Sequence, residues 1–427
     1  MKKIFCEVMI AVLFLYSGAA CGQAPPAGSN AEFSLVAIGD TGEKSDILTD
    51  NAKTITQLFR QDRFDLLVFL GDNFYPTGLN FGASEDFRKE VPKKIKEVLD
   101  PFREVMAGLG QKHVHAVAGN HEYYARLVLD KSFFFGAFSI SALPVGITNK
   151  GNQRADTIST WTYHYGLPAE ATFAAGQDSL QLIFFDSAIL LRTKPETWRP
   201  SLAHLQRLLA STRQRPRVKW RIFAAHHPLY SVGDHGGYSE WDPESRAVRY
   251  LNHCDADSNA VNYFQNLVDP EDLCAERYRA YRDSVQAAIH RSGVTVQLAL
   301  SGHDHSLQLL HYPGLHPALA SLEPLAPRGA RWALGQACAT CPKNFLISGA
   351  GAKANSVKAP SPSRGEYTCP DPEPKRQGKS QFGFARMDFQ GERLRVRFFS
   401  GKTKKEIDMG GGRREFFIKP DGMLEAK

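Results

Sequence analysis

The sequence predicts an α/β fold in which polar side chains gather at one edge of a sheet. The 427-residue chain alternates apolar runs of strand length with runs whose apolar positions repeat at helical spacing. Five of the apolar runs lead directly into a short segment rich in Gly, Asp, Asn or His. Because parallel strands bring their carboxyl ends to one edge, where ligands bind in open α/β folds, we expect the five segments to meet there.

The first half of the chain predicts a strand–helix–strand unit, then a second helix and a third strand. The predicted strands cover residues 33–38, 66–70 and 114–118, and the predicted helices cover residues 52–60 and 87–109. Proline removes a helical hydrogen bond, so the second helix is expected to break or bend at Pro92 and Pro101. This order indicates a βαβ unit with a polar segment after each strand.

The second half repeats the alternation. Strands are predicted at residues 180–185, 218–225, 294–300 and 345–347, a helix at 202–209, and a hairpin at 382–399 that turns at 390–391. No repeat of fixed period is present. We therefore predict one domain over residues 31–402, followed by a C-terminal tail at residues 403–427.

Two stretches depart from this alternation. Residues 236–275 are polar and aromatic, and residues 312–342 are rich in Pro, Gly, Ala and Leu. Each closely follows one of the five polar segments or its neighbouring strand. Long connections of this kind are usually lids or binding loops, so we predict two insertions on the rim of the site.

The start of the chain has the three parts of an export signal. Lys2 and Lys3 are basic, and residues 8–15 form an apolar stretch too short to span a bilayer. The small residues 18–20 are typical of a cleavage site. We therefore expect export to the periplasm or the extracellular space, with residues 22–30 as a tether to the domain.

Cys21, the last residue of the signal segment 1–21, allows two interpretations. It resembles the lipid acceptor of bacterial lipoproteins, although Gly18 stands where such sites usually have an aliphatic residue. Simple cleavage is the plainer interpretation. Lipidation of Cys21, which would anchor the protein to a membrane, stays open.

The remaining cysteines predict disulfides. Cys254, Cys274, Cys338, Cys341 and Cys369 would lie in an oxidising compartment, where disulfides are the default. The spacing of Cys338 and Cys341 is also found in zinc knuckles, but the chain has no second such pair to complete four ligands. We expect disulfide bonds, and an odd number of cysteines leaves one unpaired.

Composition narrows the class of protein and of partner. With 43% hydrophobic and 23% charged residues, the chain has the composition of a globular protein. The net charge of +7 favours anionic substrates or surfaces. The basic residues are dispersed and form no basic helix or aromatic-interleaved stripe, so we expect no nucleic-acid partner.

The five polar segments together have the donor set of a metal site. They cover residues 39–42, 71–75, 119–122, 225–228 and 302–305. Their candidate metal ligands are two carboxylates, a phenol, an amide oxygen and three imidazoles, a mixture that suits a pair of transition-metal ions. Each segment alone is common, since Gly-Asp forms turns and Asn caps helices. Their joint occurrence in this order is the specific signal.

The set resembles the calcineurin-like metallophosphoesterases, and within them the purple acid phosphatases of the small mammalian, tartrate-resistant type. The resemblance extends from about residue 33 to about residue 400 and includes Leu-Gly-Asp-Asn-Phe-Tyr at 70–75, Gly-His-Asp-His-Ser-Leu-Gln at 302–308 and Ser-Gly-Ala-Gly at 348–351. It implies an α/β fold built as a two-sheet β sandwich flanked by helices, here with the two rim insertions.

The resemblance also implies a binuclear metal centre. The first metal would take Asp40, Asp72, Tyr75 and His305, and the second would take Asp72, Asn120, His226 and His303. Many relatives have a ligating histidine at position 42, where this chain has Gly42. A phenolate from Tyr75 would replace it and favours Fe(III), which predicts a purple colour. The second ion would be divalent Fe, Zn or Mn.

The implied reaction is hydrolysis of a phosphate ester by metal-bound hydroxide. His121, beside Asn120, is predicted to donate a proton to the leaving group or to hydrogen-bond the phosphate. His235 matches a second catalytic histidine of the family, and a surface loop histidine is the alternative. His227 and Asp304 are predicted to lie next to the ligands and to orient them rather than to ligate.

We therefore expect an exported acid phosphatase that acts on small phosphomonoesters. A phosphodiesterase or a nucleotide pyrophosphohydrolase on the same metal core is the alternative, because such relatives share the ligands and differ in rim loops. A non-enzymatic surface binding protein is a minor alternative that the complete ligand set disfavours. The role of residues 190–200, which occupy the place of an exposed regulatory loop in the mammalian enzymes, and the oligomeric state stay open.

Overall fold

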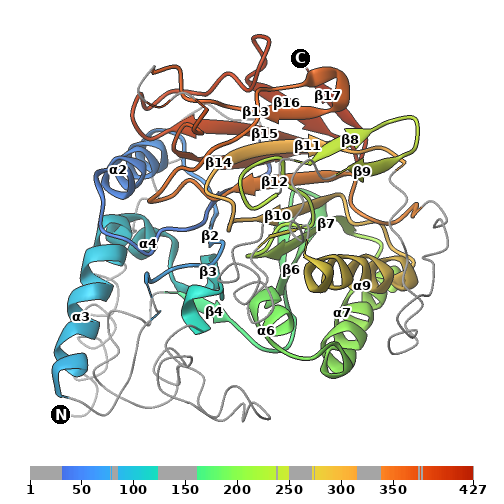
Figure 1. The fold of residues 1–427 in the computed structure, drawn as a ribbon, viewed down its shortest axis with the longest axis horizontal. Helices are drawn as coiled ribbons and strands as arrows, with labels where there is room; N and C mark the ends of the chain where they lie inside the picture. The colour runs from blue at the N-terminus through green and yellow to red at the C-terminus, as the bar shows by residue number, and fades with distance from the viewer. Residues whose placement is uncertain are drawn as a thin grey trace, which may run out of the picture.

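A computed structural model places two mixed sheets face to face, with helices on both outer surfaces (Figure 1). The description covers residues 31–76, 78, 85–123, 161–236, 239–249, 272–273, 275–314, 338–373, 376 and 378–426. The signal segment, the tether, Cys254, Cys274 and most of both predicted insertions lie outside the described residues. The predicted two-sheet α/β fold is confirmed.

The first sheet has eight strands in the order β17-β16-β15-β14-β1-β2-β3-β4. Their bounds are β1 Phe33–Ile38, β2 Leu66–Phe69, β3 Val114–Val117, β4 Thr162–His164, β14 Gly383–Gln390, β15 Arg393–Ser400, β16 Glu415–Ile418 and β17 Leu424–Ala426. Strands β1 to β4 are parallel, and β14 to β17 pair antiparallel. The parallel half therefore carries the first three polar segments at one edge.

The second sheet has seven strands in the order β13-β11-β12-β10-β7-β6-β5. Their bounds are β5 Ala169–Ala175, β6 Asp178–Phe185, β7 Val218–Ala225, β10 Leu298–Ser301, β11 Leu307–His311, β12 Asn344–Ser348 and β13 Glu366–Thr368. Strands β6, β7, β10 and β12 are parallel neighbours. A separate hairpin pairs β8 (Glu240–Asp242) with β9 (Ala247–Arg249).

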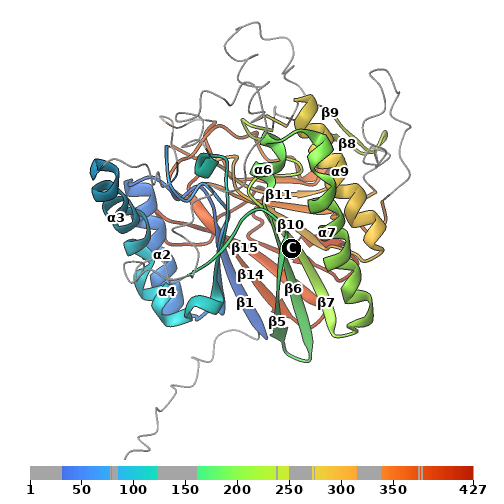
Figure 2. The same ribbon diagram turned by 90° about the horizontal axis from the view of Figure 1, so that it is seen from below.

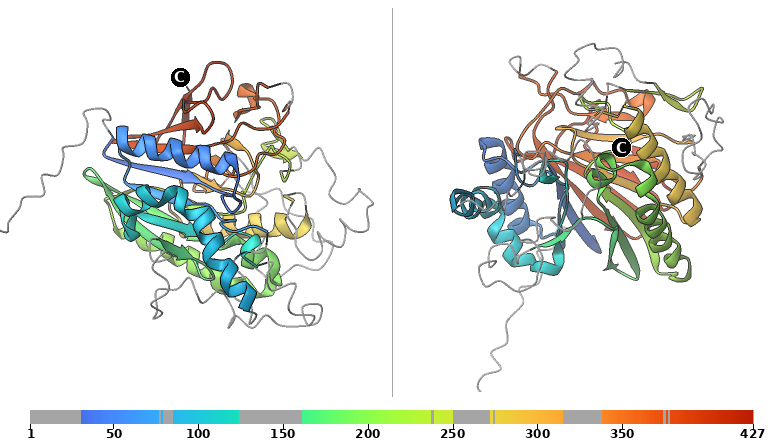
Figure 3. Two further views of the ribbon diagram at one scale, coloured as in Figure 1. Left: turned by 90° about the vertical axis from the view of Figure 1, so that its left-hand side faces the viewer. Right: turned by 60° about the horizontal axis from the view of Figure 1, so that its bottom comes forward.

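Three buried clusters account for the layers. The central cluster packs alternate residues of both sheets, such as Leu35 of β1 against Leu182 of β6, and closes the sandwich. The helices α2 (Asp46–Gln61), α3 (Glu85–Leu99) and α4 (Arg103–Leu109) cover the outer face of the first sheet. The helices α6 (Ser187–Arg192), α7 (Arg199–Ser211) and α9 (Glu276–Ser292) cover the second (Figures 2 and 3).

Most predicted elements match, with three differences. The helix predicted at 87–109 breaks at Pro101, where a 3₁₀ turn separates α3 from α4, but α3 continues through Pro92. The strand predicted from residue 294 begins only at Leu298. The hairpin at 382–399 forms as β14 and β15, with its turn at residues 391–392.

The predicted C-terminal tail is part of the sandwich. Residues 403–427 contribute β16 and β17 to the first sheet, and Phe416 and Ile418 are fully buried in the central cluster. Strand β16 has only four residues and follows the glycines at 410–412, so its short apolar run does not predict a strand by itself. It forms because it pairs with β15. Within the described residues, no helix has both the length and the apolar character needed to cross a membrane.

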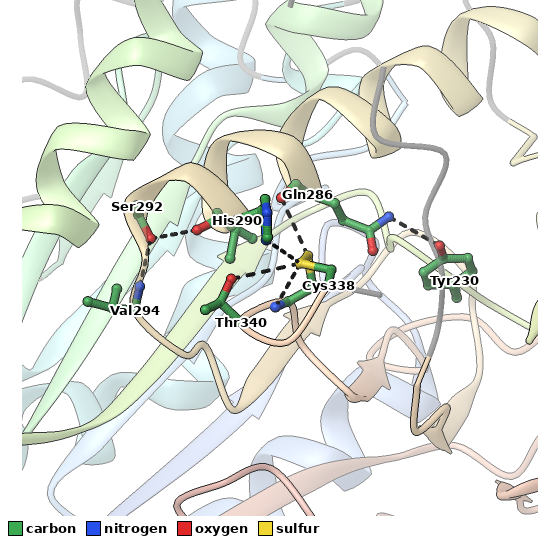
Figure 4. The surroundings of a disulfide bond; sticks show 9 residues. Tyr230, Gln286, His290, Ser292, Val294, Cys338 and Thr340 are labelled. Atoms are coloured by element: carbon green, nitrogen blue, oxygen red, sulfur yellow. Dashed lines mark hydrogen bonds between the residues drawn. A yellow bond between two sulfur atoms is a disulfide. The ribbon is translucent and has the colours of Figure 1, made fainter. Parts of the chain in front are cut away.

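A disulfide joins Cys338 to Cys341 beside α9 (Figure 4). The sulfur of Cys341 contacts the carbonyl oxygen of Gln286 at 3.4 Å, and the backbone N–H of Val296 donates to the carbonyl of Thr340. Through these contacts residues 338–341 lie against α9 and the start of the chain that leads into β10. Among the described cysteines, Cys369 is buried and free.

Candidate metal centre

Three of the polar segments contain a residue in a backbone conformation that L-residues rarely adopt. Asp40, Asp72 and His303 have positive φ values of 58°, 51° and 65°. Such strain persists only where the surroundings fix the conformation, and it is often found at functional sites. Each of the three follows a glycine, and here each turn points its polar side chain across the edge of the sandwich.

Glycine is required where the two sheets approach each other. A Cβ atom on Gly71 would lie 2.5 Å from Nδ1 of His226, and one on Gly119 would lie 2.2 Å from Oδ1 of Asp72. No side chain fits at either position. Gly71 therefore lets the loop after β2 approach His226 of the second sheet, and Gly119 lets the loop after β3 approach Asp72.

The first group of donors is rich in oxygen. We call Asp40, Asp72, Tyr75 and His305 the oxygen-rich group. Donor atoms of Asp40, Asp72 and His305 all lie within 4.8 Å of one another. The Tyr75 hydroxyl donates to Oδ1 of Asp40 at 3.1 Å and lies 3.0 Å from Nε2 of His305. The phenol therefore joins a carboxylate from β1 to an imidazole from the loop after β10.

The second group of donors is rich in nitrogen. We call Asn120, His226 and His303 the nitrogen-rich group. Nδ1 of His226 lies 2.8 Å from the carbonyl oxygen of Leu70, which can only accept, so Nδ1 carries the proton. Nε2 of His226 then faces Oδ1 of Asn120 at 2.9 Å. The ring of His303 has its centroid 5.1 Å from that of His226.

Asp72 lies between the two groups. Its Oδ1 is 3.4 Å from Nε2 of His226, and its Oδ2 is 3.7 Å from Nε2 of His121. Burial opposes the charge of this carboxylate, but His226 and His121 outweigh burial and lower the pKa of Asp72. Burial likewise opposes a charge on His226, whose pKa the Asp72 carboxylate nevertheless raises to about 9. Positive charge from both neighbouring histidines therefore keeps the buried Asp72 carboxylate ionised.

The donor chemistry fits a pair of transition-metal ions. Burial, together with the carboxylates of Asp40 and Asp72, raises the pKa of the Tyr75 phenol well above its usual value. A phenolate would therefore form there only beside a strong cation. Carboxylate, phenolate, amide oxygen and imidazole nitrogen are the mixed hard and borderline donors that such cations prefer. The oxygen-rich and nitrogen-rich groups supply these donors at one buried edge of the sandwich.

A comparison with protein families decides the identity. Residues 33–307 match the model of the calcineurin-like phosphoesterases. The chain belongs to this family. Together with the two donor groups, membership makes the protein a metal-dependent phosphoester hydrolase with a dimetal centre.

The chain resembles individual proteins of known structure only distantly. No curated protein matches the chain in sequence. Among solved structures, the phosphoesterase is similar to GAP50, the anchor in the inner membrane complex of Plasmodium (13% identity, 89% of each chain, TM-score 0.47). It is also similar to PhoD (11% identity, 94% of this chain and 72% of that chain, TM-score 0.45). A dimetal phosphatase from Danio rerio shares 14% identity over 91% of this chain and 99% of its own, with a TM-score of 0.38.

His121 of the phosphoesterase lies at the mouth of the site. Its Nδ1 contacts the carbonyl oxygen of Pro76 and therefore carries a proton, which leaves Nε2 facing Asp72. Its side chain is 23% exposed, the most of the histidines at this edge. Burial lowers the pKa of His121, and Asp72 opposes this effect. The position suits a group that exchanges protons with a substrate.

His235 lies beside the histidines of the site, and its catalytic role stays a prediction. The centroid of its ring lies 4.6 Å from that of His303, and its Nδ1 is 3.2 Å from Oδ1 of Asp272. The backbone N–H of Leu273 donates to the carbonyl oxygen of His235. The described end of the 236–275 insertion therefore contacts His235 directly. No motif in the sequence marks Asp272 as its partner.

His227 and Asp304, the two residues predicted to orient ligands, each contact a serine near the site. Nδ1 of His227 lies 2.8 Å from Oγ of Ser187, and its ring centroid lies 4.4 Å from that of His303. Asp304 accepts a hydrogen bond from Ser231 and so holds the loop that leads to His235. The donor atoms of His226, His227 and His303 also lie within 4.8 Å of one another, so His227 is close to the nitrogen-rich group.

Glu122 is a residue whose importance the sequence did not reveal. Its buried carboxylate accepts four backbone N–H groups, from Gly119 at 2.6 Å, Asp72 at 3.1 Å, Asn73 at 2.7 Å and Phe74 at 3.1 Å. Burial and the charge of Asp72 raise the pKa of Glu122 to about 8, against the effect of these donors. Glu122 therefore fixes the loop after β2 to the loop after β3. The feature of the sequence that could have indicated this role is the position of Glu122 directly after His121 in a polar segment.

Proposed function

We propose that the phosphoesterase is an exported acid phosphatase of the purple acid phosphatase type that hydrolyses small phosphomonoesters. In this proposal Fe(III) binds the oxygen-rich group, and divalent Fe, Zn or Mn binds the nitrogen-rich group. Asp72 would belong to both ligand sets. The observation that carries the proposal is the position of the Tyr75 phenol between Asp40 and His305.

The packing around Gly42 supports the choice of Tyr75. A Cβ atom on Gly42 would lie 2.4 Å from the backbone nitrogen of Phe74, so no histidine fits at this position. The loop that fills the space bonds to Gly42 on both sides: Gly42 N–H donates to the Asp72 carbonyl, and Tyr75 N–H donates to the Gly42 carbonyl, each at 2.9 Å. The same backbone contacts that exclude a histidine thus bring the phenol into the site.

Bound metal ions would polarise the phosphoryl oxygens and lower the pKa of a coordinated water. The chain supplies the remaining functions. His121 directs Nε2 into the mouth of the site, where it can protonate a leaving alkoxide. His235, oriented by Asp272, has its ring next to those of His303 and His305, where it can hold a phosphate oxygen. Asp304 accepts a hydrogen bond from Ser231, and His227 lies in hydrogen-bond contact with Ser187, so both side chains are fixed beside the nitrogen-rich group.

The proposal of export rests on the signal segment 1–21 and is supported by the Cys338–Cys341 disulfide, which is typical of oxidising compartments. Mass spectrometry of the secreted or periplasmic protein would show whether the chain begins after residue 20 or 21 and whether Cys21 carries lipid. A cytoplasmic, uncleaved protein would contradict this part of the proposal.

One experiment tests the function. The purified mature protein should contain about two metal ions per chain, at least one of them iron, absorb visible light, and hydrolyse a phosphomonoester faster than a phosphodiester at acidic pH. A faster reaction with the diester would favour the diesterase or pyrophosphohydrolase alternative. A colourless protein that holds only zinc or manganese after iron loading would contradict the Fe(III)–phenolate assignment. A protein with both metals and no turnover would favour the binding-protein alternative.

A further inference from the structure

The segment of residues 348–353 after β12 passes directly beside the oxygen-rich group. Gly39 N–H donates to the carbonyl oxygen of Ser348 at 2.7 Å, and Ala352 N–H donates to the carbonyl oxygen of Asp40 at 3.0 Å. A Cβ atom on Gly351 would lie 2.2 Å from the carbonyl oxygen of Gly39. The backbone is therefore fastened to the Asp40 turn, and Lys353 follows at the rim of the site.

Lys353 places a positive charge against a predicted metal ligand. Its Nζ lies 3.8 Å from the centre of the Tyr75 ring, whose hydroxyl contacts Asp40. The ring of His121 lies against the same tyrosine, with its centroid 4.4 Å away. Lys353 also interacts electrostatically with His121. The ammonium group and the predicted proton donor thus flank one aromatic ring at the mouth of the site.

The ammonium group is available for another anion. Its contact with a carboxylate is an ion pair of 3.0 Å with Glu43, in which the Lys353 side chain is 37% exposed and the Glu43 side chain is 50% exposed. Exposed ion pairs of this kind contribute little free energy, because water screens the charges and both side chains lose freedom. The lysine can therefore exchange Glu43 for a more highly charged partner at small cost.

We propose that Lys353 is a substrate-binding residue that contacts the dianionic phosphoryl group of a phosphomonoester at the metal centre. This inference rests on the proposed function. A lysine on a flexible stem binds phosphate as a point charge and needs no bidentate geometry. A dianion gains more from such a charge than the monoanion of a diester, so Lys353 would favour monoesters as substrates. Glu43 holds the ammonium group near the site when the substrate is absent.

Inorganic phosphate is the probe, and its binding to the metal-loaded protein is measured by calorimetry alongside metal content. Lys353→Met keeps the aliphatic stem over Tyr75 and should weaken phosphate binding about 10-fold, as expected for a lost charge-assisted hydrogen bond. Lys353→Arg should recover most of the affinity. Lys44→Met removes a nearby exposed lysine that pairs with Glu97 and serves as the matched control, with unchanged affinity.

Glu43→Gln gives a prediction of opposite sign. Removal of the competing carboxylate should strengthen phosphate binding, whereas general damage to the loop would weaken it. Phosphate affinity of Lys353→Met within twofold of the wild type would overturn the inference, and so would loss of a metal ion in that variant, because the lysine would then act through Tyr75. Weaker binding in Glu43→Gln would overturn it too.

The substrate preference separates this inference from the proposed function. Lys353→Met should raise the KM for a monoester more than the KM for a diester while kcat changes little, and equal effects on both KM values would refute the contact with a dianion. Phosphate binding requires no turnover. A wild-type protein that binds phosphate but hydrolyses no monoester would end the proposed function, while the affinities of the Lys353 and Glu43 variants would still decide the role of the lysine.

Discussion

The oxygen-rich and nitrogen-rich groups differ in how the fold builds them. Three of the four oxygen-rich residues follow strands of the first sheet, and Tyr75 is fixed by backbone contacts at Gly42. Two of the three nitrogen-rich residues follow strands of the second sheet, and His226 is oriented by a carbonyl of the first. Each sheet therefore contributes a different chemistry, and Asp72 connects them.

The difference supports the proposal that the two ions are unlike. Carboxylate and phenolate oxygens suit a trivalent ion, and imidazoles suit a divalent one. A substitution in one group should therefore change one ion first, unless it affects Asp72 or the backbone that both groups share.

The largest expected effect is the loss of a ligand from the nitrogen-rich group. His303→Ala should release the divalent ion and lower turnover by on the order of 10³-fold, while the oxygen-rich group keeps iron and its colour. Metal analysis and the visible spectrum measure this separation. If both ions remain bound with full occupancy, the assignment of His303 as a ligand fails.

His121→Ala should lower turnover on an unactivated alkyl phosphate by roughly 10²- to 10⁴-fold, as is typical for the loss of a general acid. Metal content should not change, because His121 belongs to neither group. His113→Ala, at a half-buried histidine after α4, is the control. Full activity of the His121 variant on the alkyl substrate would show that another group donates the proton.

Glu122→Gln tests the backbone contact between the loops that carry Asp72 and Asn120. The amide would leave two of the four buried N–H groups without an acceptor, which should reduce the free energy of unfolding by about 4 kcal/mol. Chemical denaturation measures the change, and Glu104→Gln at the surface is the control. A variant as stable as the wild type would mean that water or a movement of the loop replaces the carboxylate.

Acid should loosen the strand that leads to Asn120. His115 of β3 and His164 of β4 are hydrogen-bonded at 2.8 Å and stack near Phe184. Burial lowers the pKa of His115 from 6.5 to about 4 and that of His164 to about 3. The folded state therefore favours the neutral rings, and their stabilisation is complete above pH 6.5 and lost as the pH falls toward 4.

For His115 alone this lowered pKa corresponds to about 3 kcal/mol between pH 6.5 and pH 4. Unfolding free energies across this range should fall less steeply in the double variant His115→Phe, His164→Phe than in the wild type. His204→Gln, on α7, should keep the wild-type slope. An unchanged slope in the double variant would show that other groups control acid stability.

Tyr75→Phe should have the smallest effect on stability and the clearest spectral effect. The side chain keeps its packing against Lys353 and His121, so the fold should be retained. The visible band should disappear, because no phenolate remains to bind iron. Tyr165→Phe is the control, and a purple Tyr75 variant would show that a different residue supplies the charge-transfer ligand.

The sequence predicted the site better than it predicted the sheet edges. Strands that lead into polar motifs have long apolar runs and glycine turns, so β1, β2, β3 and β7 could be placed closely. The strands β16 and β17 are short, and they gain their stability from pairing, β16 with β15 and β17 with β16, so the sequence alone predicts a tail there. Residues such as Asp272 and Lys353 belong to no motif that states their role.

The sequence by itself determined the residue types of the metal centre, because donor chemistry and the glycines of tight turns are properties of local segments. It also determined the α/β class, because strand and helix periods are local patterns. Only the tertiary structure decided that the donors divide into two groups, that Glu122 holds four backbone amides, and that Lys353 lies against Tyr75. These features depend on contacts between segments far apart in the chain, and such contacts exist only once the two sheets have packed.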